Sequence, residues 1–492
     1  MPDDCFDLSA LDERLALVVR GRKVVVVTTV AASAAESVSQ LHRYGAQRAL
    51  VIAHGPGLGD LPSVEEAELL LHPLPERPTL MSAEIQAHIA FVASLPPAVV
   101  EAVYRYDPDA SALWWLLGMV EADETLLGRR VLGGRRANWA ALEDKTLGDE
   151  IFDAAGVRRP PTLVVPAQGS ALLSAATDLD SGDGTVWSGD AREGMNGGGE
   201  FVRWVRTTTA ASRAIQLFET HCDRVRISPF LDGVPCSIHG VVLPDGVAVL
   251  RPVELLVLRG QEDRFVYAGM STWWDPPAQD RDVMRETARR VGTHLARTVG
   301  FRGGFSVDGV LSAEGWLPTE LNPRFAGGLT TIARALDGFP LQFLQAALVA
   351  GMDTGLTARG LEQGLLTAAD ERRNVVMHAI STAFRSEQII TDRVVLDSRS
   401  LRRAEQGATA LASVEVGPAA LGVIVRFKPA EATMVRGYRA APYACALLDF
   451  ADREYGTDFG ACTSAPMVSG ASAADGRGWR RSDERARTAR RP

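Results

Sequence analysis

The chain has 492 residues, of which 46% are hydrophobic and 23% are charged, and its formal net charge is −9. A chain of this length usually forms two or three domains, and the composition is that of a soluble globular protein. The acidic balance disfavours nucleic acid as a partner. The five cysteines are scattered and include no Cys-x-x-Cys pair, which argues against a disulfide framework and a zinc site.

The two ends of the chain bear on its location. The start is acidic, whereas a secretory signal has a basic start followed by an apolar stretch. No apolar run approaches the ~18 residues of a membrane span. We therefore expect a cytoplasmic protein without a membrane partner. Residues 465–492 are basic and poor in apolar residues, and we expect them to form a disordered basic tail.

Residues 1–137 have the pattern of an open α/β domain. Residues 23–30 include a continuous run of valines, typical of a buried parallel strand. A helical pattern follows over residues 32–44, and residues 48–53 predict a second strand. This order predicts a β-α-β layer. The turn after the first strand lacks Gly-x-Gly-x-x-Gly, so the dinucleotide fingerprint is missing.

The rest of the chain divides into two further units, for which we expect an α/β domain over residues 138–352 and an α+β domain over residues 353–464. Residues 178–199 are rich in Gly, Asp and Ser and predict a long mobile loop, while residues 329–351 predict one helix. The remaining expectations are strands at 224–230, 237–243, 247–258, 375–381 and 423–427, a hairpin at 301–322, and helices at 281–299 and 444–455.

Arginine has almost replaced lysine in this chain. The only lysines are Lys23, Lys145 and Lys428, a bias that fits a GC-rich genome. The compact ammonium of lysine and the planar guanidinium of arginine are not interchangeable. A lysine that survives such a bias is therefore a candidate for a role that arginine cannot fill.

The hairpin has a short loop that sets its register. Residues 305–312 and 316–322 flank the sequence Ala-Glu-Gly, and a three-residue loop favours glycine at its left-handed position, where Gly315 lies. Such a loop pairs Ser312 with Trp316.

Counting back along this ladder brings three polar side chains together. Asp308 falls opposite Glu320, and Asn322 lies on the same face because residues two apart point the same way. Two carboxylates and an amide oxygen are ligands that Mg²⁺ prefers, with nucleotide phosphates completing its octahedron. The sequence therefore predicts a magnesium site on this hairpin.

The residues after the hairpin strengthen the prediction. Arg324 can bind phosphate or carboxylate with its bidentate fork. Gly327 and Gly328 permit a close backbone approach before a helix, whose N-terminus favours anions. The stretch DGVLSAEGWLPTELNPRFAGG resembles the metal-binding end of ATP-grasp enzymes, in which D-x₁₁-E-x-N-P-R recurs.

This resemblance covers about residues 140–350 and implies a fold and a set of ligands. The implied fold class is α/β (α+β): an ATP-grasp fold with an N-terminal open α/β pre-grasp domain and a C-terminal α+β domain. The implied cofactors are ATP and two Mg²⁺, with Asp308, Glu320 and Asn322 as the metal ligands. Arg302 and Arg324, at the two ends of the hairpin region, are the expected catalytic arginines.

The resemblance also assigns upstream residues to the nucleotide. Lys145, in EDKTLGDEIFDAAGVRRPP, matches the family's phosphate-binding lysine. The loop with Gly197, Gly198 and Gly199 resembles the glycine-rich flap over the triphosphate. Most relatives carry a second lysine on the strand before this flap, but this chain has Val-Trp there, and Arg192 is the expected substitute. The remaining assignments are the backbone groups of Phe230 and Leu231, which pair with adenine at the hinge.

The three-part layout resembles the pheganomycin-type peptide ligases of natural-product biosynthesis. It implies an ATP-dependent carboxylate–amine ligation through an acyl phosphate, with a carboxylate and an amino acid or peptide amine as small-molecule substrates. It is compatible with a homodimer. Two alternatives remain open: an ATP-grasp ligase or carboxylase of primary metabolism, and a nucleotide-binding regulatory protein without catalysis, which the absent lysine would favour.

Overall fold

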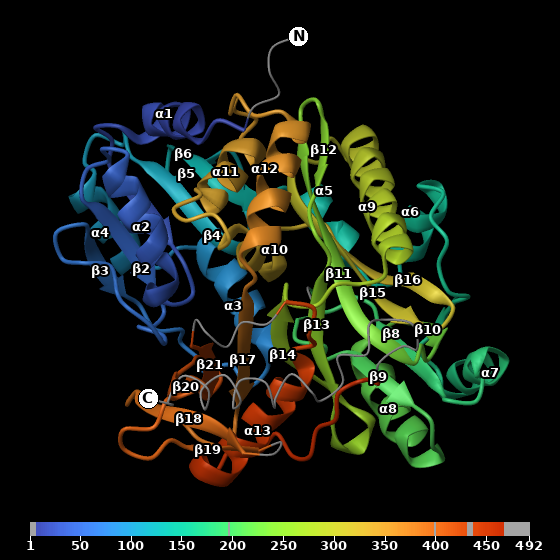
Figure 1. The fold of residues 1–492 in the computed structure, drawn as a ribbon. Helices are drawn as coiled ribbons and strands as arrows, with labels where there is room; N and C mark the ends of the chain where they lie inside the picture. The colour runs from blue at the N-terminus through green and yellow to red at the C-terminus, as the bar shows by residue number, and fades with distance from the viewer. Residues whose placement is uncertain (1–5, 195–196, 398–399, 431–435, 467–492) are drawn as a thin grey trace, which may run out of the picture.

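The described part of the chain folds around three β-sheets. The computed structural model describes residues 6–194, 197–397, 400–430 and 436–466 (Figure 1). Most of the expected basic tail, residues 467–492, lies outside the described residues. The expected fold class is confirmed: the architecture is mixed α/β, with an N-terminal parallel sheet, a small antiparallel sheet and a large antiparallel sheet.

The N-terminal sheet has the order β3-β2-β1-β4-β6-β5. Its strands pair in parallel except β5. Alternate valines of β1 (Val24–Val27) enter two different hydrophobic clusters, so both faces of this sheet are covered, as a central parallel strand requires. The other elements are β2 (Ala49–Ala53), β3 (Ala67–Leu71), β4 (Leu113–Glu121), β5 (Thr125–Leu126), β6 (Arg129–Arg135), α1 (Leu8–Val19), η1 (Ala31–Ala34), α2 (Ala35–Arg43), α3 (Met81–Ala93) and α4 (Pro97–Tyr106).

The small sheet has four antiparallel strands in the order β7-β10-β8-β9. One strand, β8 (Thr185–Gly189), lies within the region expected to be a mobile loop, so that expectation was wrong there. Trp187 is fully buried against Phe218, which anchors the strand. The other elements are β7 (Leu163–Pro166), β9 (Val202–Val205), β10 (Arg224–Pro229), α7 (Gly169–Leu179) and α8 (Thr208–His221).

The large sheet joins the middle of the chain to its C-terminal part. Its order is β16-β15-β11-β13-β14-β17-β21-β20-β18-β19, with β12 paired to β11. Its strands are β11 (Gly233–Leu243), β12 (Gly246–Val249), β13 (Val253–Arg259), β14 (Phe265–Ser271), β15 (Gly303–Ser312), β16 (Gly315–Asn322), β17 (Val375–Ser381), β18 (Ile390–Asp397), β19 (Ser400–Arg403), β20 (Ala412–Pro418) and β21 (Val423–Pro429).

Two expected elements are each divided in the structure. The expected strand at 247–258 is β12 and β13, because Pro252 between them has no N–H to donate. The expected helix at 329–351 is α10 (Gly327–Ala333) and α11 (Leu341–Val349), separated by a turn with Gly338 in the left-handed region. The remaining helices are α5 (Ala137–Ala140), η2 (Ala141–Glu143), α6 (Gly148–Ala154), η3 (Gln261–Asp263), α9 (Ala278–Val299), α12 (Ala358–Glu371) and α13 (Ala441–Tyr455).

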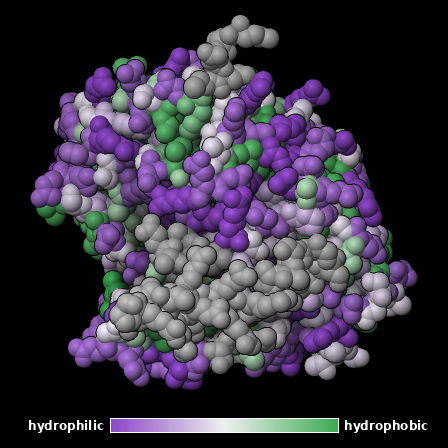
Figure 2. Space-filling model, viewed as in Figure 1, coloured by the Kyte–Doolittle hydropathy of each residue, from purple (hydrophilic) through white to green (hydrophobic). Residues whose placement is uncertain are grey.

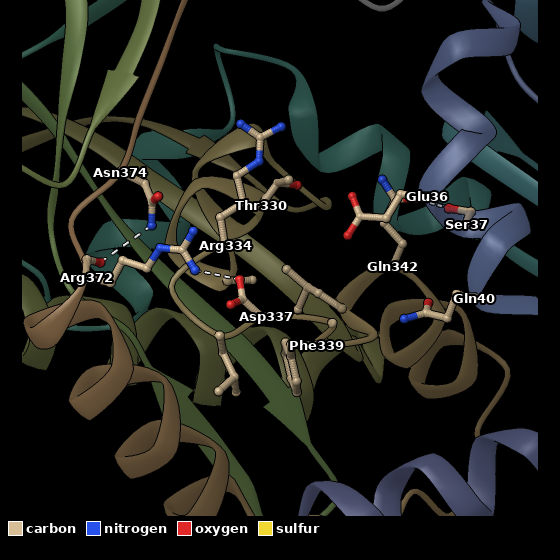
Figure 3. Close-up of a pocket in the computed structure, with 14 residues that line it drawn as sticks. Glu36, Ser37, Gln40, Thr330, Arg334, Asp337, Phe339, Gln342, Arg372 and Asn374 are labelled. Atoms are coloured by element: carbon tan, nitrogen blue, oxygen red, sulfur yellow. Dashed lines mark hydrogen bonds and ion pairs between the residues drawn. The ribbon is translucent and has the colours of Figure 1, made fainter. Parts of the chain in front are cut away.

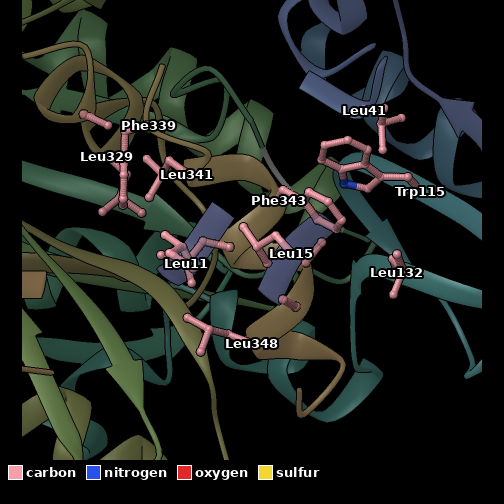
Figure 4. Packing of buried hydrophobic residues seen from close by; sticks show 14 of the residues in the cluster. Leu11, Leu15, Leu41, Trp115, Leu132, Leu329, Phe339, Leu341, Phe343 and Leu348 are labelled. Carbon is pink, nitrogen blue, oxygen red and sulfur yellow. The ribbon is translucent and has the colours of Figure 1, made fainter. Parts of the chain in front are cut away.

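The N-terminal layer packs against the middle of the chain through α11. Leu11 and Leu15 of α1, Trp115 of β4 and Phe343 of α11 belong to one buried cluster (Figure 4). The rings of Trp115 and Phe343 lie 5.1 Å apart between centroids. This packing sets α2 opposite the turn between α10 and α11.

The described residues contain no single helix that is long and apolar enough to cross a membrane. The bent pair formed by α3 and α4 reaches that length and apolar composition only when the two helices are taken together.

Candidate functional site: a carboxylate–lysine site between two sheets

The β15–β16 hairpin brings the three predicted metal ligands together. Asp308 lies opposite Glu320 in the ladder, as the sequence predicts. Asn322 pairs with Ser306 and therefore lies two residues farther along, on the same face. Its Nδ2 donates a hydrogen bond to Asp308 Oδ2 over 3.0 Å. The hairpin thus gathers two carboxylates and an amide on one patch.

Asp308 pairs with Glu320 as expected, but the register of the hairpin near its loop differs from the expected one. Ser312 pairs with Gly315 rather than with Trp316, so the ladder begins one position out of the expected register. An irregularity after Asp308 leaves Thr319 as an extra residue and restores the register at Glu320. The position of the bulge could not be read from the strand pattern.

The charges on this patch favour a bound cation. Burial, together with the Glu320 carboxylate, raises the pKa of Asp308 to about 6. Two carboxylates and an amide oxygen form a hard oxygen donor set that fits Mg²⁺. The described residues contain no group of three or more His, Cys, Asp and Glu side chains that could hold a metal. A metal here would therefore draw on Asn322 and on ligands from outside the protein.

Lys145 reaches this patch from the segment between η2 and α6. Its Nζ lies 3.5 Å from Glu320 Oε2, and its side chain is only 13% exposed. A cavity of about 20 Å³ lies beside the pair, where the small sheet meets the hairpin. It is lined by Asp144, Lys145, Gly148, Ser188, Arg226, Thr319, Glu320 and Leu321. Lys145 is thus the one of the three lysines that the fold places with the hairpin carboxylates.

Arg226 is a cation of this site that the sequence did not indicate. It lies on β10 directly opposite Ser188 of β8, the strand that carries no lysine. Its Nε and Nη2 each donate to a carboxylate oxygen of Asp149 over 2.8 Å. The alternating strand pattern of residues 224–228 could have shown that Arg226 faces one side, but not that this side is the cavity.

Replacing Arg226 by methionine is expected to lower the free energy of unfolding by about 3–5 kcal/mol, because the Asp149 carboxylate loses its bidentate partner in a buried site. The Arg226 and Asp149 side chains are only 5% and 9% exposed. Urea unfolding measures the loss. The control Arg206→Gln breaks an ion pair whose arginine is 52% exposed and is expected to cost less than about 1 kcal/mol. Equal losses in the two variants would contradict the prediction.

Arg324 lies beside the metal patch but already has partners. Its Nη2 donates to Asn322 Oδ1 over 3.1 Å. Its Nε lies 2.6 Å from Glu143 Oε1, an ion pair without hydrogen-bond alignment. Glu143 also pairs with Arg135 over 2.8 Å and is a second residue of the site that the sequence did not indicate.

The structure does not bring Arg302 and Arg192 to this patch. Arg302 precedes β15, six residues before Asp308, which corresponds to about 20 Å along a strand. Arg192 points to the end of α8, where its Nη1 donates to the carbonyl oxygen of Cys222 and lies 3.3 Å from Asp223 Oδ1. Their expected roles with phosphate and catalysis therefore receive no geometric support.

Two of the three predicted flap glycines, Gly197 and Gly198, lie against α3. A Cβ atom on Gly197 would meet Ile85 at 2.7 Å, and one on Gly198 would meet Met81 at 3.1 Å. Gly199 has a φ of +72° and open space around it. Glu200, the next residue, accepts hydrogen bonds from the first backbone N–H groups of α3, so this loop is attached to the N-terminal layer.

The predicted hinge is only partly available for adenine. The N–H of Phe230 donates to the carbonyl oxygen of Gly184 over 3.0 Å. The Phe230 ring stacks on Trp204 with centroids 4.1 Å apart. In this conformation the Phe230 N–H is therefore engaged by Gly184, and its assignment as a donor to adenine stays a prediction. Leu231 lies in the irregular segment between β10 and β11, where the assignment stays a prediction.

The backbone of Gly328 closely approaches another group, as expected, but that group is the side chain of His239. A Cβ atom on Gly328 would lie 2.1 Å from His239 Nε2. His239 is 1% exposed, and burial lowers its pKa to about 3, so it stays neutral. The helix that follows, α10, has only seven residues, and the expected anion site at its N-terminus is not supported.

No protein-family model and no curated protein matches the chain. Among solved structures, it is similar to the phosphoribosylamine–glycine ligase of Thermotoga maritima, with 14% identity, a TM-score of 0.47, and coverage of 90% of this chain and 98% of that chain. It is also similar to the carboxyaminoimidazole ribonucleotide synthase of Aspergillus clavatus complexed with ATP, with 12% identity, a TM-score of 0.48, and coverage of 88% of this chain and 99% of that chain. A third similar structure is the L-amino acid ligase of Bacillus licheniformis, with 13% identity, a TM-score of 0.45, and coverage of 87% of this chain and 98% of that chain. Such identities and TM-scores do not assign a family.

Proposed function

We propose that the protein is an ATP-grasp ligase that joins a carboxylate to an amine and forms ADP and phosphate. The observation that carries the proposal is the convergence of Asp308, Glu320 and Asn322 with Lys145 at the junction of two sheets. Carboxylates for a magnesium ion and a retained lysine for phosphate are the parts that phosphoryl transfer needs. ATP and Mg²⁺ are accordingly the proposed cofactors.

The chain's own residues have distinct parts in this reaction. Asp308, Glu320 and Asn322 would hold Mg²⁺, which supplies charge neutralisation at phosphate oxygens. Lys145 places a fixed positive charge beside them, and Arg324 holds its guanidinium next to Asn322. Arg226, and not Arg192, is the arginine that lines the cavity beside Lys145.

The proposed chemistry has two steps. A carboxylate oxygen of the first substrate attacks the γ-phosphorus of ATP, the bond to the ADP oxygen breaks, and an acyl phosphate forms. The neutral amine of the second substrate then attacks the acyl carbon, phosphate leaves, and the nitrogen loses a proton. Because an acyl phosphate hydrolyses, water must be excluded while it exists.

The finer proposal is a peptide or amide ligase of secondary metabolism, acting on small-molecule substrates. It rests on the sequence resemblance of residues 308–328 and on the three-part layout. The regulatory alternative keeps its support from the absent strand lysine, because the neighbouring Arg226 is paired with Asp149.

ADP release is expected to depend on a carboxylate and an amine supplied together. The measurement is a coupled ADP assay with ATP, Mg²⁺ and pooled amino acids and short peptides, followed by subdivision of the active pool. Bicarbonate alone is the control for a carboxylase and should give no stimulation. ATP binding without release above background for any pair would contradict the proposal and favour a regulatory protein.

A further inference from the structure

A second cavity lies between α2 and the turn that separates α10 from α11. Its volume is about 230 Å³. Figure 3 shows Glu36, Ser37 and Gln40 of α2 on one side and Thr330 and Arg334 on the other. Figure 2 shows hydrophilic side chains gathered over α10 in the middle of this face of the molecule. None of these residues belongs to the carboxylate–lysine site.

Two side-chain amides with unused hydrogen-bonding groups line the cavity. Gln40 is 7% exposed, and its side chain makes no hydrogen bond with any described residue. Ser37 donates to Gln342 Oε1 over 2.6 Å, which fixes the Gln342 amide and leaves its amino group without a described partner. The polar atoms of both amides open onto the cavity, where they can hydrogen-bond with water or with a polar ligand.

The rim of the cavity presents one free charge of each sign. Glu36 and Arg334 form no ion pair or hydrogen bond with another described residue, although both line the cavity. A second pair of rim charges, Asp337 and Arg372, neutralise each other in an ion pair of 2.5 Å. The unpaired charged groups that line the cavity are thus the Glu36 carboxylate and the Arg334 guanidinium.

The remaining walls are apolar. Phe339 and Leu341 are 5% and 6% exposed, and Ala333 and Leu336 complete the wall. The volume is below the ~300–1,000 Å³ of cavities for drug-sized ligands, and equals about seven or eight water volumes. A phosphate-bearing ligand does not fit, because only one unpaired cation is present and Glu36 would repel it.

We infer that this cavity binds a free α-amino acid with an apolar side chain. The Arg334 guanidinium pairs with the α-carboxylate and the Glu36 carboxylate with the α-ammonium group, since these are the two free charges of the rim. The Gln40 and Gln342 amides complete the polar contacts, and the apolar wall receives the side chain. The inference does not depend on the ligase activity proposed for the other site.

Calorimetric titration without ATP tests the inference, after a thermal-shift survey of all proteinogenic L-amino acids at millimolar concentration. L-leucine is the titrated probe, with L-leucinamide and N-acetyl-L-leucine as analogues that lack one charge each. We expect both analogues to bind about 10–100-fold more weakly, as for loss of a hydrogen bond to a charged group.

The variants separate the two charges. Arg334→Gln should weaken L-leucine to the level of leucinamide while leaving leucinamide unchanged. Glu36→Gln should weaken the binding of L-leucine to the level of N-acetyl-L-leucine while leaving the binding of N-acetyl-L-leucine unchanged. The matched controls Arg297→Gln and Glu101→Gln, exposed positions on α9 and α4, should bind like the wild type. No thermal shift with any amino acid, or equal binding of all three leucine compounds, would overturn the inference.

Discussion

Glu320→Ala is expected to lower ATP-dependent ADP release at least about 100-fold, the upper end of what loss of an outer-shell partner costs a metal site. Glu320 is a proposed ligand itself, and it also holds Lys145 at 3.5 Å. The measurement is kcat/KM with the active substrate pair. Glu314→Ala changes an exposed glutamate in the turn between β15 and β16, six residues before Glu320, and should retain full activity. Similar losses in both variants would contradict the assignment.

Asp308→Asn is expected to lose activity to a similar extent without losing stability. The carboxylates of Asp308 and Glu320 are directly opposed in the ladder, and like charges in that position destabilise a sheet. A neutral amide of the same shape relieves the repulsion, so the Tm measured without metal should not fall. A marked fall in Tm would mean that Asp308 is a structural residue, and would count against the metal site.

Lys145→Ala is expected to lower kcat/KM for ATP by about 10²–10³-fold, the loss typical of one preorganised donor to developing charge. Arginine should not rescue the activity. The Lys145 side chain is only 13% exposed, and the adjoining cavity of about 20 Å³ has no room for a guanidinium. This would explain why a lysine persists at this position in an arginine-rich chain.

The matched control for Lys145 is Lys428→Ala. The Lys428 side chain is 52% exposed and pairs with Glu415 over 2.6 Å, on the far part of the large sheet. Its replacement should leave kcat/KM for ATP unchanged. Full activity of Lys145→Arg, or an equal loss in Lys428→Ala, would show that the lysine at 145 is not specific for phosphate.

The local pattern of the sequence was enough to place the carboxylates. Strand alternation set Asp308, Glu320 and Asn322 on one face, and the structure has the same pairing. The expected loop register was wrong by one position, and the bulge at Thr319 corrected it. The alternation of buried and exposed residues constrains which residues pair near the middle of a strand. The position of a bulge depends instead on tertiary contacts, which this alternation does not reveal.

Long-range contacts decided what the sequence did not predict. Residues 185–189 form a strand because Trp187 is buried against α8, although the surrounding residues have a loop composition. Arg192 and Arg226 are both arginines near the flap, but only the partners that folding supplies place Arg226 at the cavity. The break between α10 and α11, which creates the second cavity, occurs within an otherwise helical pattern.

The most direct test of the proposed site is whether nucleotide binding depends on Mg²⁺ through the hairpin carboxylates. Calorimetric titration with a non-hydrolysable ATP analogue, in Mg²⁺ or in EDTA, compares the wild type with the double variant Asp308→Asn/Glu320→Ala. The wild type should bind at least about tenfold more tightly with Mg²⁺, and the double variant should lose this difference. Mg²⁺ dependence that survives unchanged in the double variant would contradict the account.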